Sequence, residues 1–243
     1  MTFTKHPRLL ARLAGVFYLM IIAFALFGYV YVRGQLFVPG DIAKTAANIV
    51  AHQQLYRSGF TASLLDVLCN IPVALLLFEL FKVVNFRLAL LAMLFIVVAA
   101  AIEAVNVFNY MMPLFILTLP QYTSAFTPLE LQALVRGSNT LFGYAFSVCL
   151  TFFGVFCVLT GYLIMRSKFL PALLGVLMIV AGVDYWTNSF VQFLALPQPP
   201  LFPHTTLIVE SSLALWLLVI GLNESKWHSQ AKAAAFCSSS GQG

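Results

Sequence analysis

Six long stretches of mostly apolar residues dominate the sequence, and short polar segments separate them. A helix needs about 20 such residues to cross a hydrocarbon core of about 30 Å, because each residue adds about 1.5 Å. Lipid offers the backbone no hydrogen-bond partner, and the alternating strand pattern of a barrel is missing, so helices are expected. The pattern predicts transmembrane helices over residues 13–32, 59–81, 88–112, 140–165, 169–190 and 205–222.

The connection between the first two predicted spans carries the signals of a short helix. Residues 38–41, Val-Pro-Gly-Asp, predict a turn in which Asp41 is the N-cap. Apolar residues then recur at helical spacing at Ile42, Ala46 and Ile49. We expect this segment to form a helix on the outer membrane surface.

A second surface helix is expected just before the fourth span. Thr127 is a typical N-cap, Pro128 takes the first helical position, and Glu130 completes a capping box. Gly137 follows as a stop signal. The helix is therefore expected to end near Gly137, ahead of the span over 140–165.

The composition agrees with a membrane protein and excludes several other classes. Hydrophobic residues make up 61% of the 243 residues and charged residues 9%, against about 25% charged in soluble proteins. The chain also lacks the polar or cysteine-rich composition of disordered, coiled-coil and disulfide-built proteins. The predicted fold is all-α, a polytopic bundle of six transmembrane helices with two short outer-surface helices over residues 1–223. Residues 224–243 are expected to form a flexible cytoplasmic tail.

Lysine and arginine are distributed unevenly between the two sides of the predicted bundle. The richer side carries nine, at Lys5, Arg8, Arg12, Lys82, Arg87, Arg166, Lys168, Lys226 and Lys232. The other side carries four, at Arg33, Lys44, Arg57 and Arg136. Under the positive-inside rule this difference places both termini in the cytoplasm. The net charge of +5 is spread too thinly to indicate a nucleic acid partner.

Three groups of short sequence motifs stand out along the chain. They are ARLAG at 11–15, VPGD at 38–41 with TAANI at 45–49, and FG at 153–154 leading through GYLI at 161–164 into RSKFLP at 166–171. Because of these motifs, residues 8–222 resemble an uncharacterised bacterial integral-membrane family, domain of unknown function 4386. The resemblance implies a multi-span protein of the bacterial inner membrane, and it brings no activity or catalytic residue with it.

Four carboxylic acids fall inside predicted spans, where ionisable groups are costly and usually face a protein interior or a cavity. Counted along their helices, all four lie about 8 to about 13 Å below the outer ends of their spans. Amides accompany three of them on the same helix faces, three or four residues later. The candidate ligand-binding residues are therefore Asp66, Asn70, Glu103, Asn106, Asp184, Asn188 and Glu210. They predict a polar pocket in the outer half of the bilayer.

The carboxyl groups allow more than one interpretation, because four of them in a small apolar space cannot all be ionised. Either Arg33, Arg57 or Arg136 pairs with them, or some stay protonated and the pocket takes up a proton or a cation. The leading hypothesis is a non-enzymatic protein that binds or transports a small or cationic ligand. The alternatives are a polar network that only specifies helix pairing, a structural partner in a membrane protein complex, and an enzyme acting on a lipid or quinone.

No motif for a common cofactor or catalytic class is present. The sequence has no H-E-x-x-H, G-x-S-x-G, G-x-G-x-x-G or P-loop pattern. No two histidines are expected to face each other across a span, so no haem site is predicted. We therefore expect no cofactor, no metal site and no catalytic residue. The expected partners are the lipid bilayer, a small-molecule or cation ligand, and a membrane protein.

Glycines recur seven residues apart in the fourth and fifth predicted spans. Gly154 and Gly161 lie in the fourth span, and Gly175 and Gly182 lie in the fifth. Residues seven apart share one helix face, and small residues there allow two helix backbones to approach closely. The spacing predicts close helix packing at these positions.

Overall fold

A computed structural model describes residues 6–197 and 205–240 of the chain, and these residues form helices and short links without a strand. In chain order the elements are α1 (Pro7–Ala25), the π-helix η1 (Leu26–Val32), α2 (Arg33–Leu36), α3 (Ile42–Ala51), α4 (Gln53–Phe81), α5 (Phe86–Thr118), α6 (Pro120–Thr123), α7 (Pro128–Arg166), α8 (Ala172–Phe193), α9 (Thr205–Val219) and α10 (Glu224–Ser240).

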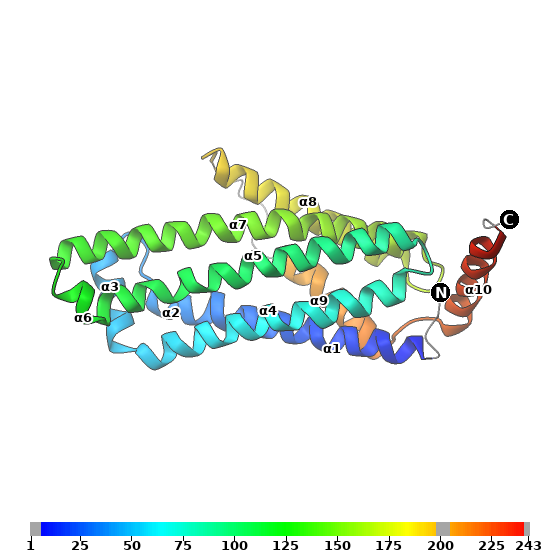
Figure 1. The fold of residues 1–243 in the computed structure, drawn as a ribbon, viewed down its shortest axis with the longest axis horizontal. Coiled ribbons are helices and arrows are strands. Elements are labelled where there is room, and N and C mark those ends of the chain that lie inside the picture. The colour runs from blue at the N-terminus through cyan, green and yellow to red at the C-terminus, as the bar shows by residue number, and fades with distance from the viewer. Residues whose placement is uncertain (1–5, 198–204, 241–243) are drawn as a thin grey trace.

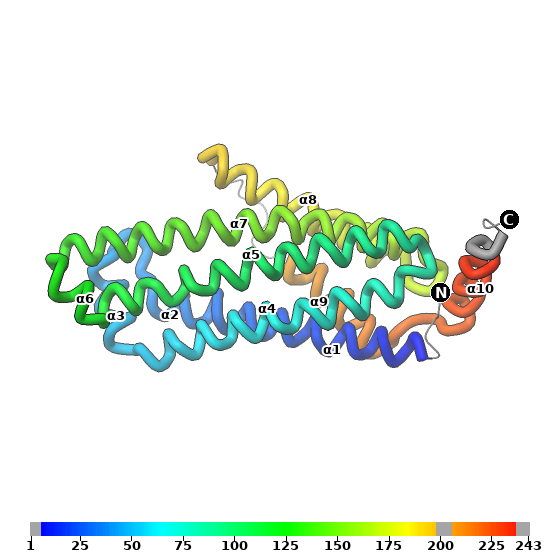
Figure 2. The backbone as a smooth tube through the Cα atoms, viewed as in Figure 1, coloured from blue at the N-terminus to red at the C-terminus, as the bar shows by residue number. Residues whose placement is uncertain are grey.

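Within the described residues, six helices form a closed ring. α1 packs against α4 and α9, and from α4 the ring continues through α5, α7 and α8 back to α9. The long helices run along the long axis of the molecule (Figure 1), whereas the far end of α8 leans outward (Figure 2). We call the end with α3 and α6 the hairpin end. The opposite end, with Arg8, Lys82, Arg87, Arg166 and Lys168 at its helix termini, is the basic end.

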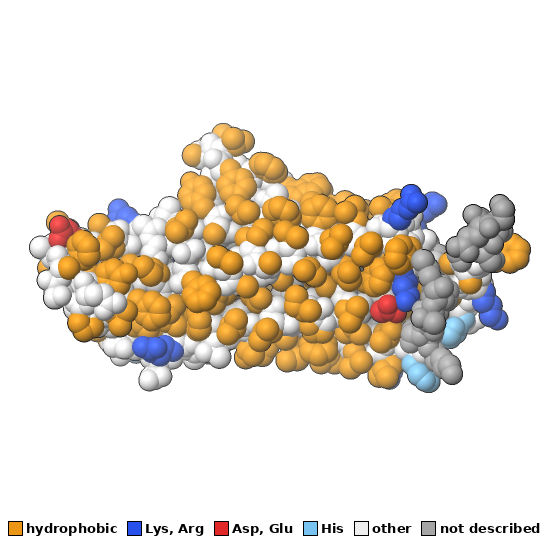
Figure 3. Space-filling view, viewed as in Figure 1, with side chains coloured by type: hydrophobic (Ala, Val, Ile, Leu, Met, Phe, Trp, Pro, Cys, Tyr) orange, Lys and Arg blue, Asp and Glu red, His pale blue; other side chains and the backbone are white. Residues whose placement is uncertain are grey.

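Five helical stretches among the described residues are long and apolar enough to cross a membrane. They are Pro7–Leu36, Gln53–Phe81, Phe86–Thr118, Pro128–Arg166 and Ala172–Phe193. On the face drawn in Figure 3, hydrophobic side chains cover the middle of the bundle and charged side chains gather at its two ends. The protein is therefore an integral membrane protein that crosses the bilayer several times.

The sixth predicted span, over 205–222, is shorter in the structure. α9 has 15 residues, about 22 Å, which is less than the hydrocarbon core of about 30 Å. α9 and α10 are together long and apolar enough for one span, but the two helices are bent by 96° relative to each other. Gly221, at a φ of +75°, lies in the turn between the two helices. A left-handed backbone conformation of this kind ends a helix at little cost only at glycine.

The first predicted surface helix forms as α3, but it packs on the bundle. Asp41 is its N-cap, and the side-chain oxygen Oδ1 accepts a hydrogen bond from the Lys44 backbone nitrogen at 2.9 Å. Thr45, Ala46 and Ile49 are buried, because α3 contacts α4, α5 and α7 at the hairpin end. These long helices provide an apolar surface there, so α3 does not need lipid to bury its apolar face.

The second predicted surface helix is the first part of α7, so the prediction of a separate helix is wrong. The capping box forms as expected, with Thr127 N donating to Glu130 Oε2 at 2.8 Å and Glu130 N donating to Thr127 Oγ1 at 3.4 Å. Gly137 does not end the helix, which continues to Arg166. A glycine inside a helix costs only about 1 kcal/mol, and the helix packing on both sides of Gly137 outweighs that cost.

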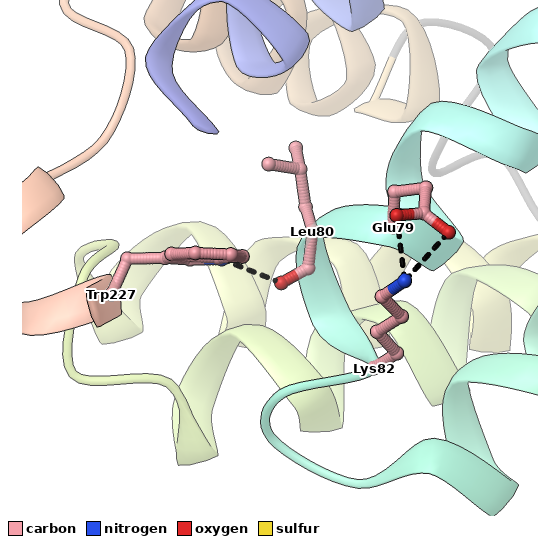
Figure 4. A network of polar contacts seen from close by, with 4 residues as sticks. All are labelled: Glu79, Leu80, Lys82 and Trp227. Atoms are coloured by element: carbon pink, nitrogen blue, oxygen red, sulfur yellow. Dashed lines mark hydrogen bonds and ion pairs between the residues drawn. The ribbon is translucent and has the colours of Figure 1, made fainter. Parts of the chain in front are cut away.

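Helix α10 occupies residues 224–240, where the sequence predicts a flexible tail, and residues 241–243 of that predicted tail lie outside the described residues. Asn223 Oδ1 accepts a hydrogen bond from Lys226 N at 3.0 Å and caps the helix. Trp227 is fully buried, and its indole nitrogen donates to the Leu80 carbonyl oxygen at 3.0 Å (Figure 4). The alanine-rich sequence over 231–235 favours a helix. Composition alone missed α10 because a docked tryptophan, the buried Ala231 and the hydrogen bonds of Gln230, not a broad apolar face, fix it to the bundle.

α7 and α8 approach each other closely at the predicted glycines. A Cβ atom on Gly161 would lie 2.5 Å from the Gly175 carbonyl oxygen, and one on Gly154 would lie 2.9 Å from the Gly182 carbonyl oxygen. Neither position leaves room for a side chain. The predicted close packing is therefore confirmed.

Candidate functional site

The carboxyl groups of Asp66, Glu103 and Glu210 line one cavity inside the ring of helices. The cavity has a volume of about 100 Å³. A cavity of about 10 to 15 Å³ already holds one water molecule, so this one has room for several waters or a small ligand. Its wall also includes Asn70, Tyr29 and Tyr185, together with apolar and aromatic side chains. Each helix of the ring contributes to the wall, with η1 extending α1.

The cavity lies about halfway along the long helices. Asp66 is the fourteenth of the 29 residues of α4, and Glu103 is the eighteenth of the 33 residues of α5. Glu210 comes from α9, five residues after Thr205. Three separate helices therefore bring their carboxyl groups to one level, where each carboxyl is buried to more than nine-tenths.

Glu103 accepts a hydrogen bond from a tyrosine and shares its cavity with a second carboxyl group. The Tyr29 hydroxyl donates a hydrogen bond to Glu103 Oε1 at 2.9 Å. The carboxyl group of Asp66, on the neighbouring helix α4, lines the same cavity. Two carboxyl groups in one low-dielectric space are not both ionised without a compensating positive charge, because burial and like charge both disfavour the second negative charge. A proton or a cation can balance the charge of these two groups.

Tyr29 reaches Glu103 from the π-helix η1. The Gly28 carbonyl oxygen accepts a hydrogen bond from the Tyr110 hydroxyl at 3.1 Å, and a Cβ atom on Gly28 would lie 2.9 Å from the Gly59 carbonyl oxygen. η1 thus approaches α4 too closely for a side chain at this point. Short π-helical segments shift the side chains that follow them and are frequent at functional sites. Here the segment holds Tyr29 over the cavity.

Glu210 has a separate tyrosine partner. The Tyr185 hydroxyl on α8 donates to Glu210 Oε1 at 2.5 Å, and both side chains line the cavity. Tyr185 is also in edge-to-face contact with Phe153, with ring centroids 5.6 Å apart. The hydrogen bond joins α8 to α9 inside the ring.

Asp66 is the least satisfied of the three carboxyl groups. Its Oδ1 atom is buried and has no hydrogen-bond partner in the structure. The Asn70 side-chain nitrogen donates to the Asp66 backbone carbonyl oxygen at 3.1 Å, not to the carboxyl group. A buried carboxyl oxygen without a partner costs free energy unless a bound group satisfies it. This atom is therefore the most open ligand position in the cavity.

The arginines expected to pair with the carboxyl groups lie elsewhere. Arg57 and Arg136 are exposed. The Arg33 guanidinium is stacked between Phe37 and Phe142, 4.2 Å and 4.6 Å from their ring centroids. Among the described residues, none of the three forms an ion pair with a carboxyl group of the cavity. Aromatic rings attract the Arg33 cation and keep it one helical turn beyond Tyr29.

One other carboxyl group does have a cationic partner. Glu79 forms an ion pair with Lys82 at 2.7 Å, beside the Leu80–Trp227 contact at the basic end (Figure 4). Glu79 is partly exposed at a helix end, where a lysine can reach it. The cavity carboxyl groups have no equivalent neighbour among the described residues.

The structure leaves three of the seven candidate residues out of the cavity wall. Asn106 is buried, but its side-chain nitrogen donates to the Phe142 carbonyl oxygen at 3.0 Å. Asp184 and Asn188 are only partly buried, and the Asn188 side-chain nitrogen donates to the Asp184 backbone oxygen at 3.0 Å. α8 presents Tyr185 to the cavity. Its neighbour Asp184 therefore points about 100° away around the helix.

The cavity does not have the donor arrangement of a protein-caged metal. Among the described residues, no three His, Cys, Asp or Glu side chains lie close enough together to hold a metal ion. The three cavity carboxyl groups are thus grouped around a space and do not converge on a single point. Such an arrangement suits a proton or a cation that keeps part of its water shell.

A comparison with known families identifies the kind of domain that carries this cavity. The family described as Domain of unknown function (DUF4386) matches residues 13–221. The chain belongs to the DUF4386 family. No curated protein and no solved structure matches it. The cavity residues of this DUF4386 member all lie inside the matched range, and α10 lies outside it.

Sequence reasoning missed Tyr29 and Tyr185 of this DUF4386 member. Tyrosines are common in apolar spans, so neither stood out beside the carboxylates and amides. The sequence signal for these tyrosines was their position. Tyr185 directly follows the candidate residue Asp184, and Tyr29 directly follows Gly28 in the first span. Only the packing of helices shows that their hydroxyl groups meet Glu210 and Glu103.

Proposed function

We propose that this protein binds a small cation in the central cavity, in exchange for a proton, and that it acts as a transporter-type membrane protein. The observation that carries the proposal is a set of three buried carboxyl groups that have no cationic partner among the described residues. The free Oδ1 atom of Asp66 adds a specific ligand position.

Charge balance supports a proton or a cation as the occupant. An ionised carboxylate inside a protein needs a compensating positive charge, or it takes up a proton. Asp66 and Glu103 line one cavity and have no cationic partner among the described residues, so a proton on one of them lowers the charge of the site. When that proton leaves, two adjacent carboxylates attract a cation into the same space. Proton and cation therefore compete for the same pair of groups.

The chemistry of the wall favours a hard cation. Carboxylate, amide and hydroxyl oxygens are the ligands that such cations prefer, and Asp66, Glu103 and Asn70 supply oxygens of this kind. The volume of about 100 Å³ leaves room for retained water. A monovalent cation such as Na⁺ or K⁺ fits these conditions without a closed cage of protein ligands.

We also propose that the protein lies in a bacterial inner membrane with both termini in the cytoplasm. The excess of Lys and Arg at the basic end supports this orientation. The hairpin end would then face the periplasm. The cavity would open and close between these two sides as the helices of the ring rearrange.

The test is the thermal unfolding midpoint of the full chain in detergent. We expect the midpoint to rise when N-methylglucamine chloride is replaced by NaCl or KCl at equal ionic strength, because a ligand stabilises the state that binds it. The rise should be present near about pH 9 and lost near about pH 5, since a protonated carboxyl group no longer attracts a cation. Asp66→Asn, which keeps the shape but removes the charge, should abolish the cation-dependent rise.

Asp184→Asn is the matched control. It makes the same chemical change on a carboxyl group in a span, but Asp184 is not on the cavity wall. The control should keep the full cation response. Equal responses in wild type, Asp66→Asn and Asp184→Asn would contradict the proposal. The carboxyl network would then serve helix pairing only.

A further inference from the structure

A second concave site lies at the basic end, away from the cavity. It is a groove of about 300 Å³ between the α7–α8 link and the turn that joins α9 to α10. Trp216 and Ile220 form an apolar wall, and the exposed Lys168 and Lys226 also line the groove. No Asp or Glu is among the residues that line it.

Hydrogen bonds between distant segments build this groove. Asn223 N donates to the Phe169 carbonyl oxygen at 3.1 Å, which joins the α9–α10 turn to the α7–α8 link. Lys168 N donates to Gln230 Oε1 on α10 at 3.4 Å. Next to Lys226, the fully buried Trp227 anchors the start of α10 on Leu80. The backbones that carry the two lysines are therefore fixed relative to each other.

The groove is electropositive. Lys168 and Lys226 are exposed, and among the described residues neither forms an ion pair. Arg8 lies beside the same turn, because a Cβ atom on Gly221 would be 3.1 Å from Arg8 Cγ. Three cationic side chains thus lie around a space whose lining carries no negative charge. An anionic group complements it.

The position of the groove indicates which anion. It lies where α7 and α9 end and α8 begins, at the basic end of the apolar spans, and its two lysines are exposed. Trp216 is partly buried and Ile220 is 48% exposed on the apolar wall of the groove. Tryptophan and lysine together at this level are typical of the membrane interface. A free phosphate would use the lysines and leave the apolar wall unused.

We propose that this groove binds an anionic phospholipid. Lys168 and Lys226 contact the phosphate of the headgroup, and Trp216 and Ile220 contact the first part of an acyl chain. Basic pockets between span ends are suited to such headgroups. The site is independent of the cavity and of the function proposed for it.

The experiment uses quenching of Trp216 fluorescence by lipids with brominated acyl chains. The full chain carrying Trp186→Phe is reconstituted in phosphatidylcholine vesicles that contain a small fraction of brominated lipid. Of the other tryptophans, Trp227 is fully buried and so is protected from the quencher. We expect brominated phosphatidylglycerol to quench more strongly than brominated phosphatidylcholine at the same fraction. Lys168→Gln with Lys226→Gln should remove this preference.

The control pair is Lys44→Gln with Arg57→Gln, which removes two exposed cationic charges at the hairpin end and should keep the preference. Lys168→Arg with Lys226→Arg should also keep it. Equal quenching by both lipids in the wild type, or a preference that persists in the double glutamine variant, would overturn the proposal. Loss of the preference in inorganic phosphate relative to chloride at equal ionic strength would support the proposal, because free phosphate competes with the headgroup for the same two lysines.

Discussion

At the scale of single residues, the cavity combines carboxyl groups with neutral hydrogen-bond donors. Tyr29 donates to Glu103 and Tyr185 donates to Glu210, so two of the three carboxyl groups are oriented by a hydroxyl group. A neutral donor orients a carboxyl group without cancelling its charge. An arginine in the same place would fill the site with its own positive charge. The tyrosines thus leave the cavity able to accept an external cation.

Tyr29→Phe should destabilise the protein, because it removes the donor to a buried carboxyl group and keeps the ring. We expect a loss of about 1 to 3 kcal/mol in the free energy of unfolding, the usual cost of a buried polar group left without its partner. Thermal unfolding in detergent measures the effect. Tyr31→Phe, two residues away on η1 and 53% exposed, is the control and should change little. Equal effects of the two substitutions would argue against a role for the Tyr29 hydroxyl.

At the scale of elements, close helix contact depends on which glycine faces which neighbour. Gly161 and Gly175 meet across the α7–α8 contact, where no Cβ atom fits. Gly137 lies in the same helix α7, but a Cβ atom on it would have nothing within 4 Å. The same residue type therefore has opposite roles in one helix. At Gly161 it permits packing, and at Gly137 it only weakens the helix.

Gly161→Ala and Gly137→Ala should therefore have opposite effects on stability. The first places a methyl group against the α8 backbone, and such overpacking typically costs about 1 to 3 kcal/mol. The second should stabilise by up to about 1 kcal/mol, because alanine favours a helix more than glycine does. Both are measured as shifts of the thermal midpoint in detergent. A stabilising Gly161→Ala would show that α7 and α8 can separate at no cost.

At the scale of the whole molecule, the bundle is longer than a bilayer is thick. α4, α5 and α7 have 29, 33 and 39 residues, which corresponds to about 43, 50 and 58 Å. A hydrocarbon core takes about 30 Å of this length. The hairpin end has its own buried apolar cluster, which includes Ile49, Tyr56 and Tyr110. We infer that this end projects from the membrane as a small folded cap.

Cysteine labelling in intact cells tests the orientation proposed for this bundle. Gln121→Cys at the hairpin end and Arg87→Cys at the basic end both replace exposed residues. In a background with Cys237→Ser, a membrane-impermeant maleimide should label Gln121→Cys from outside and Arg87→Cys only after lysis. The native Cys69, Cys149 and Cys157 are buried and should not react. Labelling of Arg87→Cys in intact cells would contradict the proposed orientation.

The sequence by itself determined the features that depend on local interactions. The length of apolar runs indicated the membrane class, the all-α fold and the approximate positions of the long helices, because a span must satisfy its own backbone and bury its side chains in lipid. The caps at Asp41 and Thr127 formed as predicted, because a cap involves residues only three apart. Glycine spacing likewise indicated the α7–α8 contact, since residues seven apart share a helix face in any α-helix.

The tertiary structure alone decided which polar groups meet. Asp66, Glu103 and Glu210 share a cavity while Asp184 does not, because the rotation of each helix about its axis is set by packing against its neighbours. Packing is also the reason that α7 continues beyond Gly137 and that α10 is fixed to the bundle at Trp227. Distances between helices depend on every contact around the ring. No span viewed alone contains that information.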